Sequence, residues 1–78
     1  MVDKIKICDI EDLSFDEKRA LAYTIFRKNL LEISEKLNLS PNHVRSNILP
    51  LWVQKGYIIK IYKDERTFYK LNEDVIEV

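Results

Sequence analysis

The chain has 78 residues and no net charge, with 46% hydrophobic and 33% charged residues, one glycine and two prolines. This composition is that of one ordered globular domain, residues 1–78, with a small core, and it excludes a long disordered segment. The apolar runs are too short to cross a bilayer and the amino terminus lacks the apolar core of a signal peptide, so we expect a cytoplasmic protein.

Cysteine and histidine occur once each, as Cys8 and His43. They cannot complete a four-ligand zinc site, and a lone cysteine cannot form an internal disulfide, so no metal or cofactor is expected. We expect Cys8 to be a small buried hydrophobe. It belongs to residues 4–8, which alternate like a short strand and are expected to pair with an edge of a later hairpin.

Two capping boxes mark the first two helices. Ser14 followed by Glu17 predicts a helix over residues 15–28, and Asn29 followed by Glu32 predicts a short helix over residues 30–37. Their apolar residues recur at helical spacing and should face the core: Leu21, Ile25, Phe26, Leu30, Ile33 and Leu37.

A third helix is predicted over residues 41–55, with Ser40 as its N-cap and Pro41 at its first position. Gly56 follows it as a residue able to take a positive φ. The inward stripe is expected to be Val44, Ile48, Leu51 and the stem of Lys55. Pro50 removes the hydrogen bond to the carbonyl of Ser46, so a kink is expected between these two residues.

Residues 57–71 predict a β-hairpin, because residues 57–62 and 67–71 are rich in β-branched and aromatic side chains and residues 63–66 are polar. The aromatic residues of a two-stranded ribbon more often pack across the strands than stack on bases. This expectation applies to Tyr62, Phe68 and Tyr69.

The order of three helices and a hairpin is carried by four segments: LLEISEKLNLS, SPNHVRSNI, LWVQKGYI and TFYKLN. With them the chain resembles the winged helix-turn-helix domains of small bacterial and archaeal transcription regulators, such as those of the ArsR and MarR families. The resemblance implies an α+β fold whose third helix lies in the DNA major groove, whose hairpin wing touches backbone or minor groove, and which works as a dimer. The chain lacks the cysteine pair of ArsR proteins and the long terminal helices of MarR proteins, so metal sensing and that dimer interface are not expected.

The start of the third helix carries polar side chains on its outward face. Asparagine pairs bidentately with adenine and arginine with guanine, while serine and histidine bond base edges or phosphates. A solvated helix face that happens to be short of acids is the alternative interpretation. The predicted base and phosphate contacts on this helix are Ser40, Asn42, His43, Arg45, Ser46 and Asn47.

The end of the third helix is apolar. With the inward stripe given above, Leu49 and Val53 lie on the outward side and Trp52 lies at its flank. Such a patch is typical of a dimer or partner contact, although Trp52 is equally expected to pack on the first helix or beneath the hairpin.

Charge is segregated along the chain: residues 1–17 carry −4 and residues 72–78 carry −3, whereas residues 18–39 carry +3 and residues 40–71 carry +4. A basic face, more than a basic total, favours nucleic acid. The predicted phosphate contacts of the hairpin are Lys60, Lys63, Arg66 and Lys70, and the acidic Asp64 and Glu65 at the turn oppose them.

The sequence therefore predicts a small transcriptional regulator that binds double-stranded DNA as a homodimer on a two-fold site. A winged helix that serves as a protein-interaction module in a transcription or replication assembly is the alternative. No phosphate-binding glycine loop or catalytic constellation is present, so an enzyme is not expected.

Overall fold

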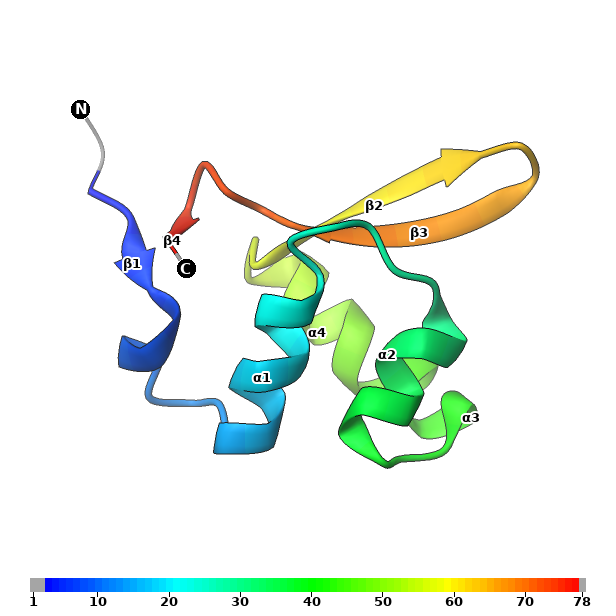
Figure 1. Ribbon diagram of the computed structural model, residues 1–78, viewed down its shortest axis with the longest axis horizontal. Helices are drawn as coiled ribbons and strands as arrows, with labels where there is room; N and C mark the ends of the chain where they lie inside the picture. Colours follow the sequence, from blue (N-terminus) through cyan, green and yellow to red (C-terminus); the bar gives the residue numbers. More distant parts are fainter. Residues whose placement is uncertain (1–2, 78) are drawn as a thin grey trace.

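The computed structural model describes residues 3–77 and is α+β, with helices packed beneath an antiparallel hairpin (Figure 1). The helical part contains α1 (Phe15–Tyr23), α2 (Leu30–Leu37) and a composite helix, residues 41–54. This composite helix joins α3 (Pro41–His43), the π-helical segment η2 (Val44–Ile48) and α4 (Leu49–Gln54). The hairpin consists of β2 (Ile58–Lys63) and β3 (Arg66–Leu71). The predicted fold class is confirmed at this level.

Local capping chemistry fixes where the helices begin. The hydroxyl of Ser14 accepts the Glu17 N–H at 3.2 Å, while the Glu17 carboxylate accepts the Ser14 N–H at 3.0 Å. Asn29 and Glu32 form the same reciprocal pair at 2.9 and 3.2 Å. Both predicted capping boxes are confirmed, and each satisfies backbone donors that have no partner inside the helix.

Helix α1 ends at Tyr23, before the predicted end at about residue 28, because the chain that follows it bonds to β3. The Thr24 carbonyl accepts the Leu71 N–H at 2.8 Å, and Lys28 and Tyr69 exchange backbone hydrogen bonds of 2.9 and 2.7 Å. Phe26 therefore lies outside the helix and is 74% exposed, contrary to the predicted core position.

The hairpin pairs Ile58 with Leu71 at its base and Lys63 with Arg66 at its tip. Asp64 and Glu65 form the turn with φ of 52° and 63°. Positive φ at both turn residues matches the right-handed twist of the flanking strands. Because Lys28 bridges to Tyr69, the other edge of β3 is also occupied.

The amino-terminal strand does not pair with the hairpin. Strand β1 (Ile5–Lys6) pairs in parallel with β4 (Ile76–Glu77), which follows the hairpin and places Ile76 in the core at 1% exposure. The next residues form a 3₁₀ turn, η1 (Ile7–Asp9), instead of continuing the strand. Cys8 is consequently exposed, so the prediction that it is buried is wrong.

The composite helix buries a different stripe from the predicted one. Val44 is buried as expected, but Leu51 is 44% exposed, while Leu49 and Trp52 are buried at 1% and 0% exposure. The cause is the π turn, in which the Leu49 N–H bonds to the Val44 carbonyl five residues earlier. A π turn contains one residue more than an α turn, so it rotates everything after it by about 100°.

This departure from α-helical geometry lies immediately before Pro50, where a kink was predicted. Ile48 is half-buried, and Lys55 is exposed and binds the Asp12 carboxylate. Gly56 follows with a φ of +80°, as predicted for a glycine after the helix end. Within residues 3–77, no helix combines the length and apolar character needed to cross a bilayer.

Candidate nucleic-acid interface

The amino-terminal half of the composite helix is held by its N-cap and points its polar side chains to solvent. The Ser40 hydroxyl accepts the His43 N–H at 3.3 Å, and Pro41 occupies the first turn. Within residues 41–47 only Val44 is buried. All the predicted contact residues of this helix are exposed: Ser40, Asn42, His43, Arg45, Ser46 and Asn47.

Two hydrogen bonds orient these side chains along the helix. The Arg45 Nη2 donates to the Asn42 Oδ1 at 3.2 Å, and the Asn47 Nδ2 lies 3.2 Å from the His43 Nδ1. An arginine has five N–H donors, so one bond to Asn42 leaves donors for a second partner. The stretch that carries these side chains, residues 36–63, contains no aspartate or glutamate, although Glu35 of α2 lines a hollow together with Pro41 at the start of the helix.

The hairpin divides its predicted contact residues between its two faces. Successive side chains of a strand point to opposite sides. Lys60 lies opposite Tyr69 and faces the composite helix, whereas Lys70 lies opposite Ile59 on the other face and is paired with Glu73 at 3.3 Å. Lys70 is therefore not brought together with the helix residues.

Lys63 and Arg66 are exposed cations that lie opposite each other in the two strands at the tip of the hairpin, next to the acidic turn residues. The face of the hairpin away from the helix also carries Arg27, whose guanidinium stacks over the Phe68 ring at 5.1 Å from its centroid. The sequence pattern alone does not place Arg27 on this face, because the bridge between Lys28 and Tyr69 is a tertiary contact.

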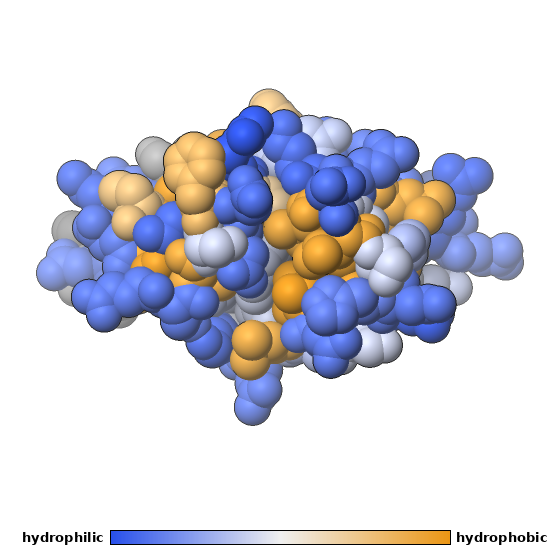
Figure 2. Space-filling view, turned by 90° about the horizontal axis from the view of Figure 1, so that it is seen from below, coloured by the Kyte–Doolittle hydropathy of each residue, from blue (hydrophilic) through white to orange (hydrophobic). Residues whose placement is uncertain are grey.

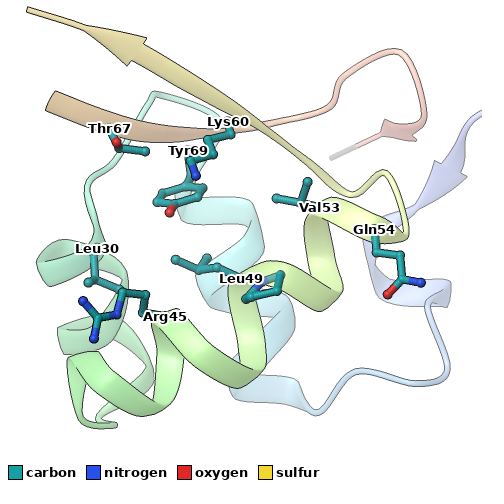
Figure 3. Close-up of a pocket in the computed structure, with 9 residues that line it drawn as sticks. Leu30, Arg45, Leu49, Val53, Gln54, Lys60, Thr67 and Tyr69 are labelled. Atoms are coloured by element: carbon teal, nitrogen blue, oxygen red, sulfur yellow. The ribbon is translucent and has the colours of Figure 1, made fainter. Parts of the chain in front are cut away.

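A groove of about 630 Å³ separates the composite helix from the hairpin (Figure 3). Its floor and walls combine apolar and polar side chains and include no acid. The lining residues are Leu30, Arg45, Leu49, Pro50, Val53, Gln54, Lys60, Thr67 and Tyr69.

Tyr69 dominates the interior of this groove. Its ring points from β3 toward the helix, above Leu49, and the residue is 9% exposed (Figure 3). Burial raises the pKa of the Tyr69 phenol above its ordinary value of 10.0, so the hydroxyl is a neutral donor at physiological pH. Among residues 3–77 this hydroxyl makes no hydrogen bond to another side chain or to the backbone.

The predicted partner patch does not form as expected. Leu49 and Trp52 are buried by the phase shift of the π turn, and only Val53 is exposed, at 40%, where it lines the groove. The indole N–H of Trp52 is buried without a partner in the described part of the chain. Trp52 thus belongs to the core, as the alternative interpretation of this residue stated.

A different apolar surface lies over α2 and the turn that follows it. Leu31 and Leu39 are 61% and 42% exposed and line a shallow hollow of about 350 Å³ together with Pro41. Seen from this end, apolar areas lie among hydrophilic side chains (Figure 2). This hollow is separate from the groove and shares none of its lining residues.

Nine of the thirteen acidic residues lie away from the tip of the hairpin, whereas Asp64 and Glu65 form its turn. Those of residues 3–17 lie just before β1, at the end of η1, in the loop that follows it and at the start of α1. Glu73, Asp74 and Glu77 lie around β4, at the opposite side of the molecule from the tip (Figure 1). Despite this density, no three histidine, cysteine or acidic side chains of residues 3–77 form a group that could hold a metal ion.

No protein-family model, curated protein or solved structure matches the chain.

Proposed function

We propose that the chain is a winged helix-turn-helix protein that binds double-stranded DNA as a small transcriptional regulator. In this proposal the amino-terminal half of the composite helix enters the major groove, and the hairpin is the wing that contacts backbone or minor groove. The order of three helices followed by a hairpin supports it, as does the bridge between Lys28 and Tyr69 that anchors the hairpin to the helices.

One observation carries the proposal most strongly. The exposed start of the composite helix presents Asn42, Arg45 and Ser46 on a surface built from an acid-free stretch, residues 36–63. Arginine and asparagine are the side chains that read guanine and adenine in the major groove, and an absence of acids removes repulsion from phosphates. The acids at the far side of the molecule would orient it with this surface toward DNA.

The proposed homodimer needs a contact other than the predicted one. Leu49 and Trp52 are buried within the chain, so a second copy does not reach them. Self-contact on a two-fold DNA site has to use exposed residues outside the base-reading surface. The hollow around Leu31 and Leu39 provides apolar area for such a contact.

The same hollow favours the second candidate, a protein-interaction module in a transcription or replication assembly. Exposed leucines in a concave surface are typical of protein contacts, and the zero net charge of the chain weakens general attraction to DNA. The two candidates differ in one respect that can be measured, because only the regulator has a preferred DNA sequence.

Selection of bound duplexes from a random pool at physiological salt tests the proposal. We expect an enriched sequence, on which Arg45→Ala loses about 1–3 kcal/mol of binding free energy while losing much less on random DNA. Arg19→Ala is the matched control, because Arg19 stacks on Phe15 in α1 and lines no part of the interface. If no sequence is enriched, the protein-interaction module becomes the better proposal.

The salt dependence of binding tests the wing. If Lys63 and Arg66 contact phosphates, replacing both by alanine should reduce the slope of log K against log salt by up to about 2 units, equally on all sequences. The control variant Lys4→Ala/Lys6→Ala removes the same charge from the opposite side of the molecule and should leave the slope unchanged. A double hairpin variant with the wild-type slope would exclude the tip from the contact surface.

A further inference from the structure

Strand β2 is an edge strand of the sheet that residues 3–77 form. Its partner β3 has neighbours on both sides, because Lys28 bridges to Tyr69 on the side away from β2. On the other side of β2, no strand or bridge of residues 3–77 is present. A two-stranded ribbon is marginally stable in water, and an uncovered edge is a template for pairing with another chain. The open edge of β2 is therefore a candidate contact surface.

The hydrogen bonds of the hairpin determine which backbone groups face this edge. The two-residue turn closes on Lys63 and Arg66, so these residues bond to each other, and the bonded pairs then alternate along the strands. In agreement with this pattern, the Tyr69 N–H bonds to the segment after α1 and not to β2. The backbone groups of Lys60, which lies opposite Tyr69, and of Tyr62 accordingly point outward.

The side chains along β2 favour a sheet contact. Residues 58–63 read IIKIYK, in which isoleucine and tyrosine have high β propensity and proline is absent. Ile59 and Tyr62 are 45% and 71% exposed. The hairpin also projects past the helices toward its tip, which leaves room for a second chain beside it (Figure 1).

A second copy of the chain fits this edge best in one register. Two β2 strands related by a two-fold axis are antiparallel, and their outward backbone groups meet only if Lys60 or Tyr62 lies opposite one of the same two residues of the second copy. Lys60 opposite Lys60 brings like charges together, which is destabilising. Tyr62 opposite Tyr62 leaves only residues 61–63 paired. Lys60 opposite Tyr62 pairs residues 59–63 and places each ammonium beside an aromatic ring.

We propose that two copies of the chain join their β2 strands in this register into one antiparallel sheet of four strands. Lys60 of each copy exchanges backbone hydrogen bonds with Tyr62 of the other, and Ile61 lies opposite Ile61 on the two-fold axis. The outer faces of the two hairpins then form one surface, on which Ile59, Ile61 and Phe68 of both copies lie together. Because the two β2 strands are antiparallel, the helices of the two copies lie towards opposite ends of the shared sheet.

Sedimentation equilibrium of the full chain without DNA tests this contact. The wild type should show a concentration-dependent equilibrium between monomer and dimer. Tyr62→Pro and Tyr62→Ala remove the same side chain, but only the proline also removes the outward N–H, and neither breaks a hydrogen bond of the hairpin. Tyr62→Pro, with the circular dichroism of Tyr62→Ala, should therefore dimerise roughly tenfold or more weakly than Tyr62→Ala. A monomeric wild type, or equal dimerisation by the two folded variants, would overturn the proposal.

An engineered disulfide tests the register and remains decisive if Tyr62→Pro fails to fold. Residue 61 meets its own copy in a pair without ladder hydrogen bonds, where Cα atoms are about 4.5 Å apart, and a disulfide needs about 4.4–6.8 Å. In a Cys8→Ser background, Ile61→Cys should form a covalent dimer on mild oxidation. Ile59→Cys is the matched control, because its two copies lie about 13 Å apart and should stay uncross-linked. Equal cross-linking of both variants, or none at residue 61, would contradict the register.

The hollow beside α2 is the competing place for a self-contact. Leu31→Ser removes apolar surface from this hollow and should dimerise like the wild type. If Leu31→Ser were monomeric while Tyr62→Pro dimerised as tightly as Tyr62→Ala, the contact would lie at the hollow and the proposal would be wrong. Because these measurements contain no DNA, failure of the protein to select a DNA sequence would leave the result on the sheet intact.

Discussion

Helix α2 and the composite helix carry the same kind of sequence pattern, but only α2 buries the face that the pattern predicts. Both begin at a side-chain cap, and both carry apolar residues at helical spacing. Helix α2 is regular from Leu30 to Leu37 and buries the predicted Ile33 and Leu37. The composite helix contains a π turn, and beyond it burial moves by one residue. Helical spacing therefore predicts a buried face only as far as the backbone stays α-helical.

Two physical contributions favour the π turn in the composite helix. A proline inside a regular α-helix costs about 3 kcal/mol, because it removes a hydrogen bond and clashes with the preceding turn. The phase shift also buries Trp52 in place of Leu51. A buried tryptophan removes about 150–250 Å² from water, worth about 4–6 kcal/mol. Both contributions favour the π turn, and the gain from burying Trp52 is the difference between its burial and that of the smaller Leu51.

Replacing the two residues that exchange places in this shift should change the stability of the protein to very different extents. Trp52→Ala should lower the free energy of unfolding by about 3–5 kcal/mol, because it leaves a cavity in the core. Leu51→Ala should lower it by less than about 1 kcal/mol, since Leu51 is 44% exposed. Urea denaturation of both variants measures the difference. A larger loss of stability for Leu51→Ala than for Trp52→Ala would contradict the phase shift and would indicate a regular helix with Leu51 buried.

A smaller effect concerns the proline itself. In the interior of a regular α-helix, replacing a proline by alanine would stabilise the protein by about 3 kcal/mol. Pro50 instead lies in the first turn of α4, directly after the π turn. Pro50→Ala should therefore destabilise the protein by about 0.4–1 kcal/mol, because alanine leaves the unfolded chain more freedom. If Pro50→Ala instead raised the free energy of unfolding by several kcal/mol, the π turn would not remove the clash and lost hydrogen bond that a proline causes in a regular helix.

A still smaller effect concerns the pH dependence of stability. The phase shift places Leu49 beneath the Tyr69 ring, where it helps to bury the phenol. A phenol with a raised folded-state pKa loses its proton first in the unfolded state, so the free energy of unfolding falls as pH rises above about 10. Between about pH 9 and about pH 11, Tyr69→Phe should lose less stability than the wild type, by under about 1 kcal/mol. Tyr62→Phe, which removes an exposed hydroxyl, should show the full wild-type loss.

Helix starts and the hairpin could be predicted from the sequence, because they depend on neighbouring residues. Ser14 with Glu17, and Asn29 with Glu32, form reciprocal hydrogen bonds between residues only three positions apart. Gly56 allows the positive φ after the helix. The exposure of residues 42, 43 and 45–47 also follows from spacing, since these positions precede the irregular part of the helix or lie on its outward side.

Features that depend on distant residues could not be predicted in this way. The end of α1 is set by bonds from Thr24 to Leu71, and the partner of β1 is β4, at the other end of the chain. The groove also escaped prediction, because it exists only where the hairpin folds over the composite helix. Its members Gln54 and Thr67 carry no pattern that distinguishes them from solvated polar residues.

The pairing of β1 with β4 has a consequence for the order in which the chain folds. Ile5 bonds to Val75 and pairs with Ile76, so this contact closes a loop of nearly the whole chain, whereas the hairpin and the helices close short loops. Loop-closure entropy makes such a contact slow to form, and only two residues of each strand hold it once formed. In native-state hydrogen exchange the Ile5 amide should open early and independently, while the amides of β3 exchange only on global unfolding.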